Sequence, residues 1–107
     1  MKEIDNKEFD FLLAKGEPMI VDFWAEWCGP CKIMGPMLDQ LSEAYEGSVS
    51  FYKSNVDAEP DLARRFNIMS IPTIVMFKEG RKLGSVVGAM GPDKIVDKIN
   101  ETFGFET

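Results

Sequence analysis

A nearly unbroken apolar run, Met19-Ile20-Val21-Asp22-Phe23-Trp24-Ala25, is the feature that most constrains how this chain can fold. Runs without polar alternation are typical of strands that are covered on both faces. We therefore predict a central strand over residues 19–25, with Asp22 buried inside it. This carboxylate is either satisfied by local backbone donors or kept as a functional acid. We favour the second interpretation, because the strand runs directly into the only two cysteines of the chain.

The two cysteines, Cys28 and Cys31, are separated by Gly29 and Pro30. On the first turn of a helix, residues three apart have Cβ atoms about 5–6 Å apart. A disulfide needs Cα atoms roughly 4.4–6.8 Å apart, so the pair can form one with little backbone movement. A disulfide that closes so short a loop adds little stability by the chain-entropy argument. The pattern therefore indicates reversible redox chemistry.

The position of each cysteine predicts a different role for it. Cys28 lies where the strand ends and a helix begins, and the free amides and helix dipole there favour a thiolate. We predict that Cys28 is the less enclosed residue and the nucleophile. Cys31 is expected to be more buried and to attack the mixed disulfide. Asp22 is the best available acceptor for the Cys31 proton, directly or through water, because burial raises the pKa of a carboxyl group.

The chain contains no histidine, which narrows the metal chemistry open to it. A zinc site takes about four ligands, usually Cys and His, and Cys28 and Cys31 have no such companions. A zinc site shared between two chains is the remaining metal alternative, and we expect no metal. No glycine-rich nucleotide-binding motif is present, so we expect no bound cofactor beyond the redox-active disulfide itself.

Composition argues against several classes of partner. A net charge of −6 without a basic cluster argues against nucleic acid. No apolar stretch approaches the roughly 18 residues of a membrane span. The first residues lack the basic and apolar segments of a signal peptide, from which we predict a cytoplasmic protein. A chain of 107 residues that is 45% apolar is expected to form a single domain over residues 1–107 and to be a monomer.

Helical and strand patterns alternate along the chain. In order, they predict a helix from Asp5 to Gly16 opened by a capping box with Glu8, the strand over 19–25, and a helix over 28–46 with a kink at Pro36. A strand over 49–56 and a helix over 58–66 capped by Asp57 follow. Strands over 73–77 and 83–87 and a last helix from Pro92 come last. Strands joined by helices run parallel, whereas a hairpin is antiparallel. We therefore predict an α/β fold with a mixed sheet and helices on both faces.

Lys53 is expected on the same strand face as Val49 and Phe51, which is unusual for a lysine. It is either a snorkelling lysine at a strand end or the partner of Asp22 in an ion pair. The sequence favours neither interpretation.

The segment from Asp22 to Lys32 resembles the active-site segment of the thioredoxin family, with Trp-Cys-Gly-Pro-Cys-Lys at its centre. Further residues match that family in order and spacing: Pro36, Lys53, Asp57, Ile71-Pro72-Thr73, Gly80 and Val87-Gly88-Ala89. The resemblance covers nearly the whole chain and is far more specific than a lone Cys-x-x-Cys. The short leading strand and Gly35 depart from the family pattern without touching the chemistry.

The resemblance implies a thioredoxin fold, with a mixed central sheet of four to five strands flanked by four helices. It implies a cis peptide bond before Pro72, a loop there that lies against the cysteines, and pairing of Lys53 with Asp22. Trp24 and Pro36 would be structural residues near the site. The implied substrate-docking surface comprises Trp27, Gly29, Pro30, Ile71, Pro72, Gly88 and Ala89, with the Ile71 backbone pairing with an extended substrate segment.

The implied function is a thiol–disulfide oxidoreductase that reduces disulfides in target proteins and is re-reduced by a thioredoxin reductase. The Gly-Pro between the cysteines resembles reducing members of the superfamily, since isomerases and oxidases more often carry a histidine there. Two alternatives stay open: an oxidase or isomerase, which the redox potential would distinguish, and a binding module that uses the same surface without chemistry.

Overall fold

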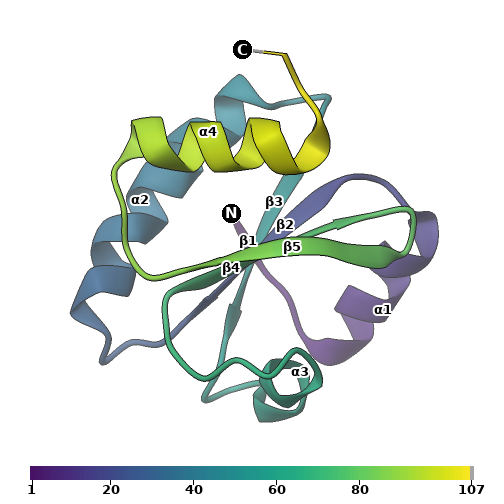
Figure 1. The fold of residues 1–107 in the computed structure, drawn as a ribbon. Coiled ribbons are helices and arrows are strands. Elements are labelled where there is room, and N and C mark those ends of the chain that lie inside the picture. The colour runs from purple at the N-terminus through teal and green to yellow at the C-terminus, as the bar shows by residue number, and fades with distance from the viewer. Residues whose placement is uncertain (107) are drawn as a thin grey trace.

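Five strands form one mixed sheet in the computed structural model, which describes residues 1–106 (Figure 1). The strands are β1 (Lys2–Glu3), β2 (Met19–Trp24), β3 (Ser50–Asn55), β4 (Thr73–Lys78) and β5 (Arg81–Val87), in the spatial order β1-β3-β2-β4-β5. β3 is parallel to both β1 and β2, whereas β4 is antiparallel to both β2 and β5. The predicted mixed sheet of four to five strands is confirmed, with five strands.

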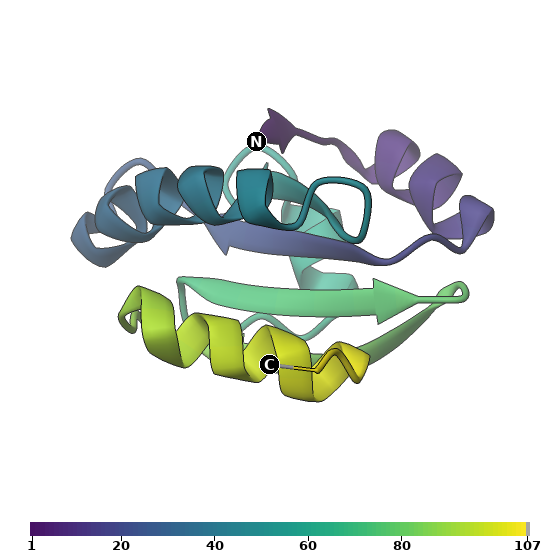
Figure 2. The same cartoon turned by 90° about the horizontal axis from the view of Figure 1, so that it is seen from above.

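Within residues 1–106, four helices cover the two faces of this sheet (Figures 1 and 2). α2 (Gly29–Ala44) and α4 (Pro92–Phe103) lie on one face, and α1 (Asn6–Lys15) and α3 (Pro60–Arg65) lie on the other. A separate hydrophobic cluster fills each side. Met34, Leu38, Ile95 and Ile99 belong to the first cluster, and Phe9, Leu62, Val75 and Phe77 belong to the second.

β2 lies at the centre of the sheet, bonded to β3 on one side and β4 on the other. All of its residues are buried except Trp24, which is half-buried. The predicted central strand is therefore confirmed, although it ends at Trp24, one residue earlier than expected. Its far end leads into the cysteine pair, so the best-packed strand of the sheet positions the site.

The leading strand β1 is only two residues long, as the sequence suggested, but it is formed. It pairs with β3 and places Glu3 beside Lys53. Because β2 pairs with the other side of β3, Asp22 also lies in register with Lys53. Three charged residues from three neighbouring strands are therefore aligned across the sheet.

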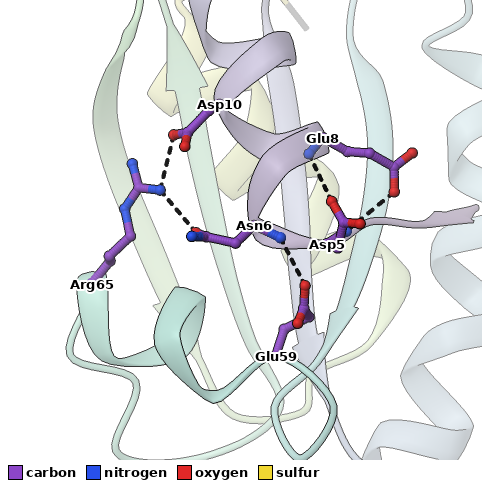
Figure 3. A network of polar contacts seen from close by, with 6 residues as sticks. All are labelled: Asp5, Asn6, Glu8, Asp10, Glu59 and Arg65. Atoms are coloured by element: carbon purple, nitrogen blue, oxygen red, sulfur yellow. Dashed lines mark hydrogen bonds and ion pairs between the residues drawn. The ribbon is translucent and has the colours of Figure 1, made fainter.

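The helix starts were predicted with mixed success. At α1, Asp5 Oδ1 accepts from the Glu8 amide at 2.7 Å and Glu8 Oε1 accepts from the Asp5 amide at 3.3 Å, so the capping box is confirmed (Figure 3). Gly16 ends α1 with a φ of 72°. The cap at Asp57 was wrong, because α3 begins at Pro60 with Glu59 as its N-cap residue.

Proline at the first helical position explains this later start of α3, since its ring fixes a helical φ and its missing N–H costs nothing there. The preceding residues form a turn held by Asn55 Oδ1, which accepts from the Asp57 and Ala58 amides at 2.9 and 3.3 Å. Glu59 does not cap its own helix with its side chain, but accepts from the Asn6 amide of α1 at 2.8 Å (Figure 3). α3 is thereby tied to the start of α1.

We expect Asp5→Ala to lower the free energy of unfolding by about 1 kcal/mol, because it removes the N-cap acceptor of α1. Urea denaturation at neutral pH measures this loss. Glu17→Ala, an exposed acid just beyond the helix, should change stability by less than about 0.5 kcal/mol. Equal effects of the two substitutions would contradict a contribution from the capping box.

Candidate active site

The two cysteines lie at the junction between β2 and α2 and form a disulfide, with Cα atoms 5.3 Å apart. Cys28 is the N-cap residue of α2 and has extended backbone angles. Its Sγ accepts a hydrogen bond from the Cys31 amide at 3.2 Å. The start of the helix therefore directs a backbone donor at the sulfur of the first cysteine, where it would stabilise negative charge.

Both cysteines are buried, with 5% of Cys28 and 2% of Cys31 exposed. The predicted order of enclosure is present but small. Ala25, Trp24, Val56 and Ile71 pack around the pair. Access for a partner therefore depends on the rim of the site, where Trp27 is 71% exposed and Gly29 and Pro30 are exposed.

Two loops that are distant in sequence meet this junction. The Ile71–Pro72 peptide bond is cis, as the family resemblance implies, and the Ile71 carbonyl oxygen lies 3.9 Å from Cys28 Sγ. The Gly88 amide donates to the Pro72 carbonyl at 2.8 Å, which joins the loop containing Gly88 and Ala89 to the same region. A φ of 93° at Gly88 suits glycine there.

Trp27 is held in place by a contact that the sequence did not reveal. Its Nε1 donates to Asp57 Oδ2 at 2.8 Å. Asp57 follows β3 and Trp27 follows β2, so the carboxyl ends of two parallel strands bring them together. The parallel pairing of these strands was the one signal from which this contact could have been inferred.

A pocket of about 290 Å³ lies beneath the cysteines, on the face of the sheet covered by α2. Its lining residues are Asp22, Trp24, Glu26, Cys31, Lys32, Gly35, Pro36, Asp39 and Lys53. Since a water molecule occupies about 30 Å³ in the liquid, the volume suffices for several. The pocket thus joins the predicted proton acceptor to the second cysteine, but not to Cys28.

Asp22 is 1% exposed, and within residues 1–106 its Oδ1 has no hydrogen-bond partner. Loss of hydration disfavours the charged form and raises the pKa of Asp22 to about 7. The positive charge of Lys53 opposes this rise in pKa, whereas the negative charges of Glu3 and Asp39 add to it. The local-donor interpretation therefore fails for Oδ1, and the carboxyl group titrates near neutral pH.

The expected ion pair between Lys53 and Asp22 does not form within 4.0 Å among the described residues. Lys53 Nζ instead lies 4.9 Å from the centroid of the Trp24 ring. Both residues line the same pocket, so the charge of Lys53 acts on Asp22 from a distance. The strand register places the Lys53 backbone beside Asp22, but the Lys53 side chain contacts the Trp24 ring instead. The predicted ion pair was therefore wrong.

Two acidic residues near Asp22 were missed by the sequence analysis. Asp39 shares a helical face with Cys31 and Gly35, at intervals of four residues, so helical periodicity could have placed it in the pocket. Glu3 has no such signal, because it reaches the site only through the pairing of β1 with β3.

No group of three or more His, Cys, Asp or Glu side chains within residues 1–106 is arranged to hold a metal ion. Over the same part of the chain, no helix has the length and apolar character needed to cross a membrane.

Comparison with known proteins identifies close relatives. The thioredoxin family model matches residues 1–101. A thioredoxin from Chlorobaculum thiosulfatiphilum is 41% identical over 103 residues, covering 95% of this chain and 95% of the relative. An M-type chloroplastic thioredoxin from Spinacia oleracea is 41% identical over 97 residues, covering 91% of this chain and 54% of the relative. The crystal structure of oxidized mitochondrial thioredoxin 3 from Saccharomyces cerevisiae matches with a TM-score of 0.86 and 35% identity, covering 94% of each chain.

The plant relatives correct the prediction of a cytoplasmic protein, because several are named as chloroplastic. This chain spans about half the length of those curated relatives. The lack of a signal-peptide pattern was the only basis for the prediction, and the physical chemistry of a folded domain does not specify its compartment.

We expect Asp22→Asn to raise stability at pH 8 and to have little effect near pH 4. A raised folded pKa means that the native state holds the proton more tightly than the unfolded chain, so native stability falls as pH rises from about 4 to about 7. Asparagine does not ionise and so avoids this loss in the free energy of unfolding, which reaches about 4 kcal/mol for a pKa difference of about three units.

Urea denaturation across that pH range measures the difference from the unaltered protein. Asp97→Asn, an exposed aspartate on α4, serves as the matched control and should show no such trend. A midpoint for Asp22→Asn at or below that of the unaltered protein at pH 8 would contradict the buried-acid interpretation.

Proposed function

Because this chain belongs to the thioredoxin family, we propose that it is a thiol–disulfide oxidoreductase that reduces disulfides in other proteins. The observation that carries this proposal is the Cys28–Cys31 disulfide at the start of α2, with its Cα separation of 5.3 Å. The proposal covers residues 1–107 as one domain acting as a monomer. Its chemistry uses only side chains of this chain and needs no bound cofactor.

The first step begins from the reduced dithiol. The Cys28 thiolate attacks one sulfur of a target disulfide, forming a mixed disulfide and releasing the other target sulfur as a thiolate. The N-terminus of α2 favours this thiolate, because the Cys31 amide and the helix dipole both point toward Cys28 Sγ. The local environment therefore supports Cys28 as the nucleophile.

The second step releases the target. Cys31 gives its proton to Asp22, directly or through water in the shared pocket, and the resulting thiolate attacks Cys28 Sγ. The Cys28–Cys31 disulfide forms, and the second target sulfur leaves as a thiolate. The target has gained two electrons and this chain has lost two. A pKa of about 7 suits Asp22 to accept a proton near neutral pH.

The rim of the cysteine pair is the proposed docking surface, formed by Trp27, Gly29, Pro30, Ile71, Pro72, Gly88 and Ala89. An extended target segment would pair with the Ile71 backbone, whose N–H makes no hydrogen bond to another described residue. Trp24 packs beside the cysteines, Pro36 lines the pocket, and Lys53 adds positive charge near Asp22.

Return to the dithiol requires two electrons from a separate donor. We propose a thioredoxin reductase in this role, on the basis of family membership. The disulfide-containing targets are other proteins that present an accessible cystine to the same surface.

We expect this protein to accelerate the reduction of insulin disulfides by dithiothreitol, measured by the turbidity of the precipitating B chain. Cys28→Ser should abolish the acceleration, because no nucleophile remains at the helix start. Cys31→Ser should instead accumulate a mixed disulfide with insulin, visible by mass spectrometry, since its resolving thiol is absent.

The matched control is Ser42→Cys assayed in the Cys28→Ser background, which restores two cysteines to the chain but places the second one on α2 away from the junction. It should remain inactive. Full activity of Cys28→Ser, or no acceleration by the unaltered protein, would overturn the proposed function.

A further inference from the structure

Glu3 ties three strands together beside the pocket. Its Oε1 accepts from Trp24 Nε1 of β2 at 2.9 Å, and its Oε2 accepts from the Asn55 amide of β3 at 2.6 Å. Each carboxylate oxygen thus holds a different strand, which fixes the orientation of the carboxylate and of the indole that it binds. The family resemblance assigned no role to this residue.

The indole held by Glu3 is also the surface on which Lys53 rests. Lys53 Nζ lies 4.9 Å from the Trp24 ring centroid, within the range of a cation–π contact. Lys53 is the direct β3 partner of both Glu3 and Asp22 in the strand register. The Lys53 ammonium group could therefore contact either the Trp24 ring or the Asp22 carboxylate, and in the structure it lies over the ring.

We propose that Glu3 is a positioning residue, which fixes the Trp24 indole so that Lys53 stays on that ring and out of a direct ion pair with Asp22. This inference rests on the proposed function, because it concerns the acid that would accept the Cys31 proton. Without the contact from Glu3, the indole loses its anchor and Lys53 becomes free to reach Asp22. A direct ion pair would stabilise the Asp22 carboxylate and weaken it as a proton acceptor.

The charged and titratable groups around Asp22 come from several elements. Lys53 lies on β3 and Glu3 on β1, and further groups come from α2 and the segment before it: Glu26, Lys32 and Asp39. Glu26 pairs with Lys32 at 3.8 Å, so those two charges oppose each other at the rim. Of the acidic residues that act on Asp22, Glu3 is the one whose side chain also accepts a hydrogen bond from the Trp24 indole.

The experiment follows the titration of Asp22 directly, by carboxyl carbon NMR on the oxidised protein with labelled aspartate. Glu3→Gln keeps the shape but carries no charge and replaces one of the two acceptor oxygens by an NH2 donor, so one of the two N–H groups loses its acceptor. We expect the Asp22 midpoint to fall by about one pH unit or more, as an opposite charge in contact produces. The same substitution in a Lys53→Met background should give at most half of that fall.

The Lys53→Met background separates positioning from the charge of Glu3 itself. A purely electrostatic effect of Glu3 gives the same fall in midpoint with and without Lys53. Equal falls, or no fall, would therefore overturn the proposal. Glu26→Gln is the matched control, since it removes an acid that lines the same pocket but makes no hydrogen bond to Trp24 within residues 1–106, and its effect should not depend on Lys53.

Trp24→Phe tests the same contact with the charge of Glu3 intact. It removes the indole N–H but retains an aromatic ring, and it should lower the Asp22 midpoint as Glu3→Gln does. An unchanged midpoint in folded Trp24→Phe would also count against the proposal. These midpoints do not depend on turnover. The expected shifts can therefore be absent in a protein that still reduces insulin, or present in one that does not, so the two proposals fail separately.

Discussion

The burial of β2 at the centre of the sheet is the constraint on which the rest of the structure depends. Side chains alternate along the strand, so Ile20 enters the cluster beneath α2 and α4, whereas Val21 and Phe23 enter the cluster beneath α1 and α3. Asp22 has the parity of Ile20 and therefore faces α2, where Cys31 lies. A register slip of one residue would place the acid among phenylalanine rings, so the pleat itself sets acid and thiol on one side.

The same burial makes the site costly to fold. Among the described residues no group pairs with the buried Oδ1 of Asp22, and its carboxyl group is desolvated; neither arrangement favours the native state. The opposite face of the sheet offsets such a cost with dense packing. Phe9 and Phe66 both contact Phe77, with ring centroids 5.1 Å apart in each pair and edge-to-face geometry. The α1/α3 side of β2 thus contributes packing alone, whereas the α2/α4 side contributes packing and also contains the candidate site.

The sequence predicted the elements whose signals are local. The Asp5–Glu8 capping box and the start of α4 at Pro92 each depend on neighbours within a few residues. Asp57 does not cap α3, because Pro60 sets a later helix start and the Asn55 side chain accepts from the Asp57 and Ala58 amides. Strand parity gave the face of Lys53, but its choice between Trp24 and Asp22 involves Glu3, which is 50 residues away and arrives only through β1. Local patterns cannot specify a contact that depends on which strands become neighbours.

The two cysteines differ less in exposure than in the electrostatic surroundings that their backbone positions impose. Exposures of 5% and 2% do not separate an attacking residue from a resolving one. Cys28 is the N-cap residue, and its Sγ accepts a hydrogen bond from the Cys31 amide. The partial positive charge of the helix start favours a thiolate at that sulfur. Cys31 lies inside the helix and lines the pocket that contains Asp22. In the proposed mechanism one sulfur carries charge and the other loses a proton, and the positions that suit them to these roles follow from where a helix begins after a buried strand.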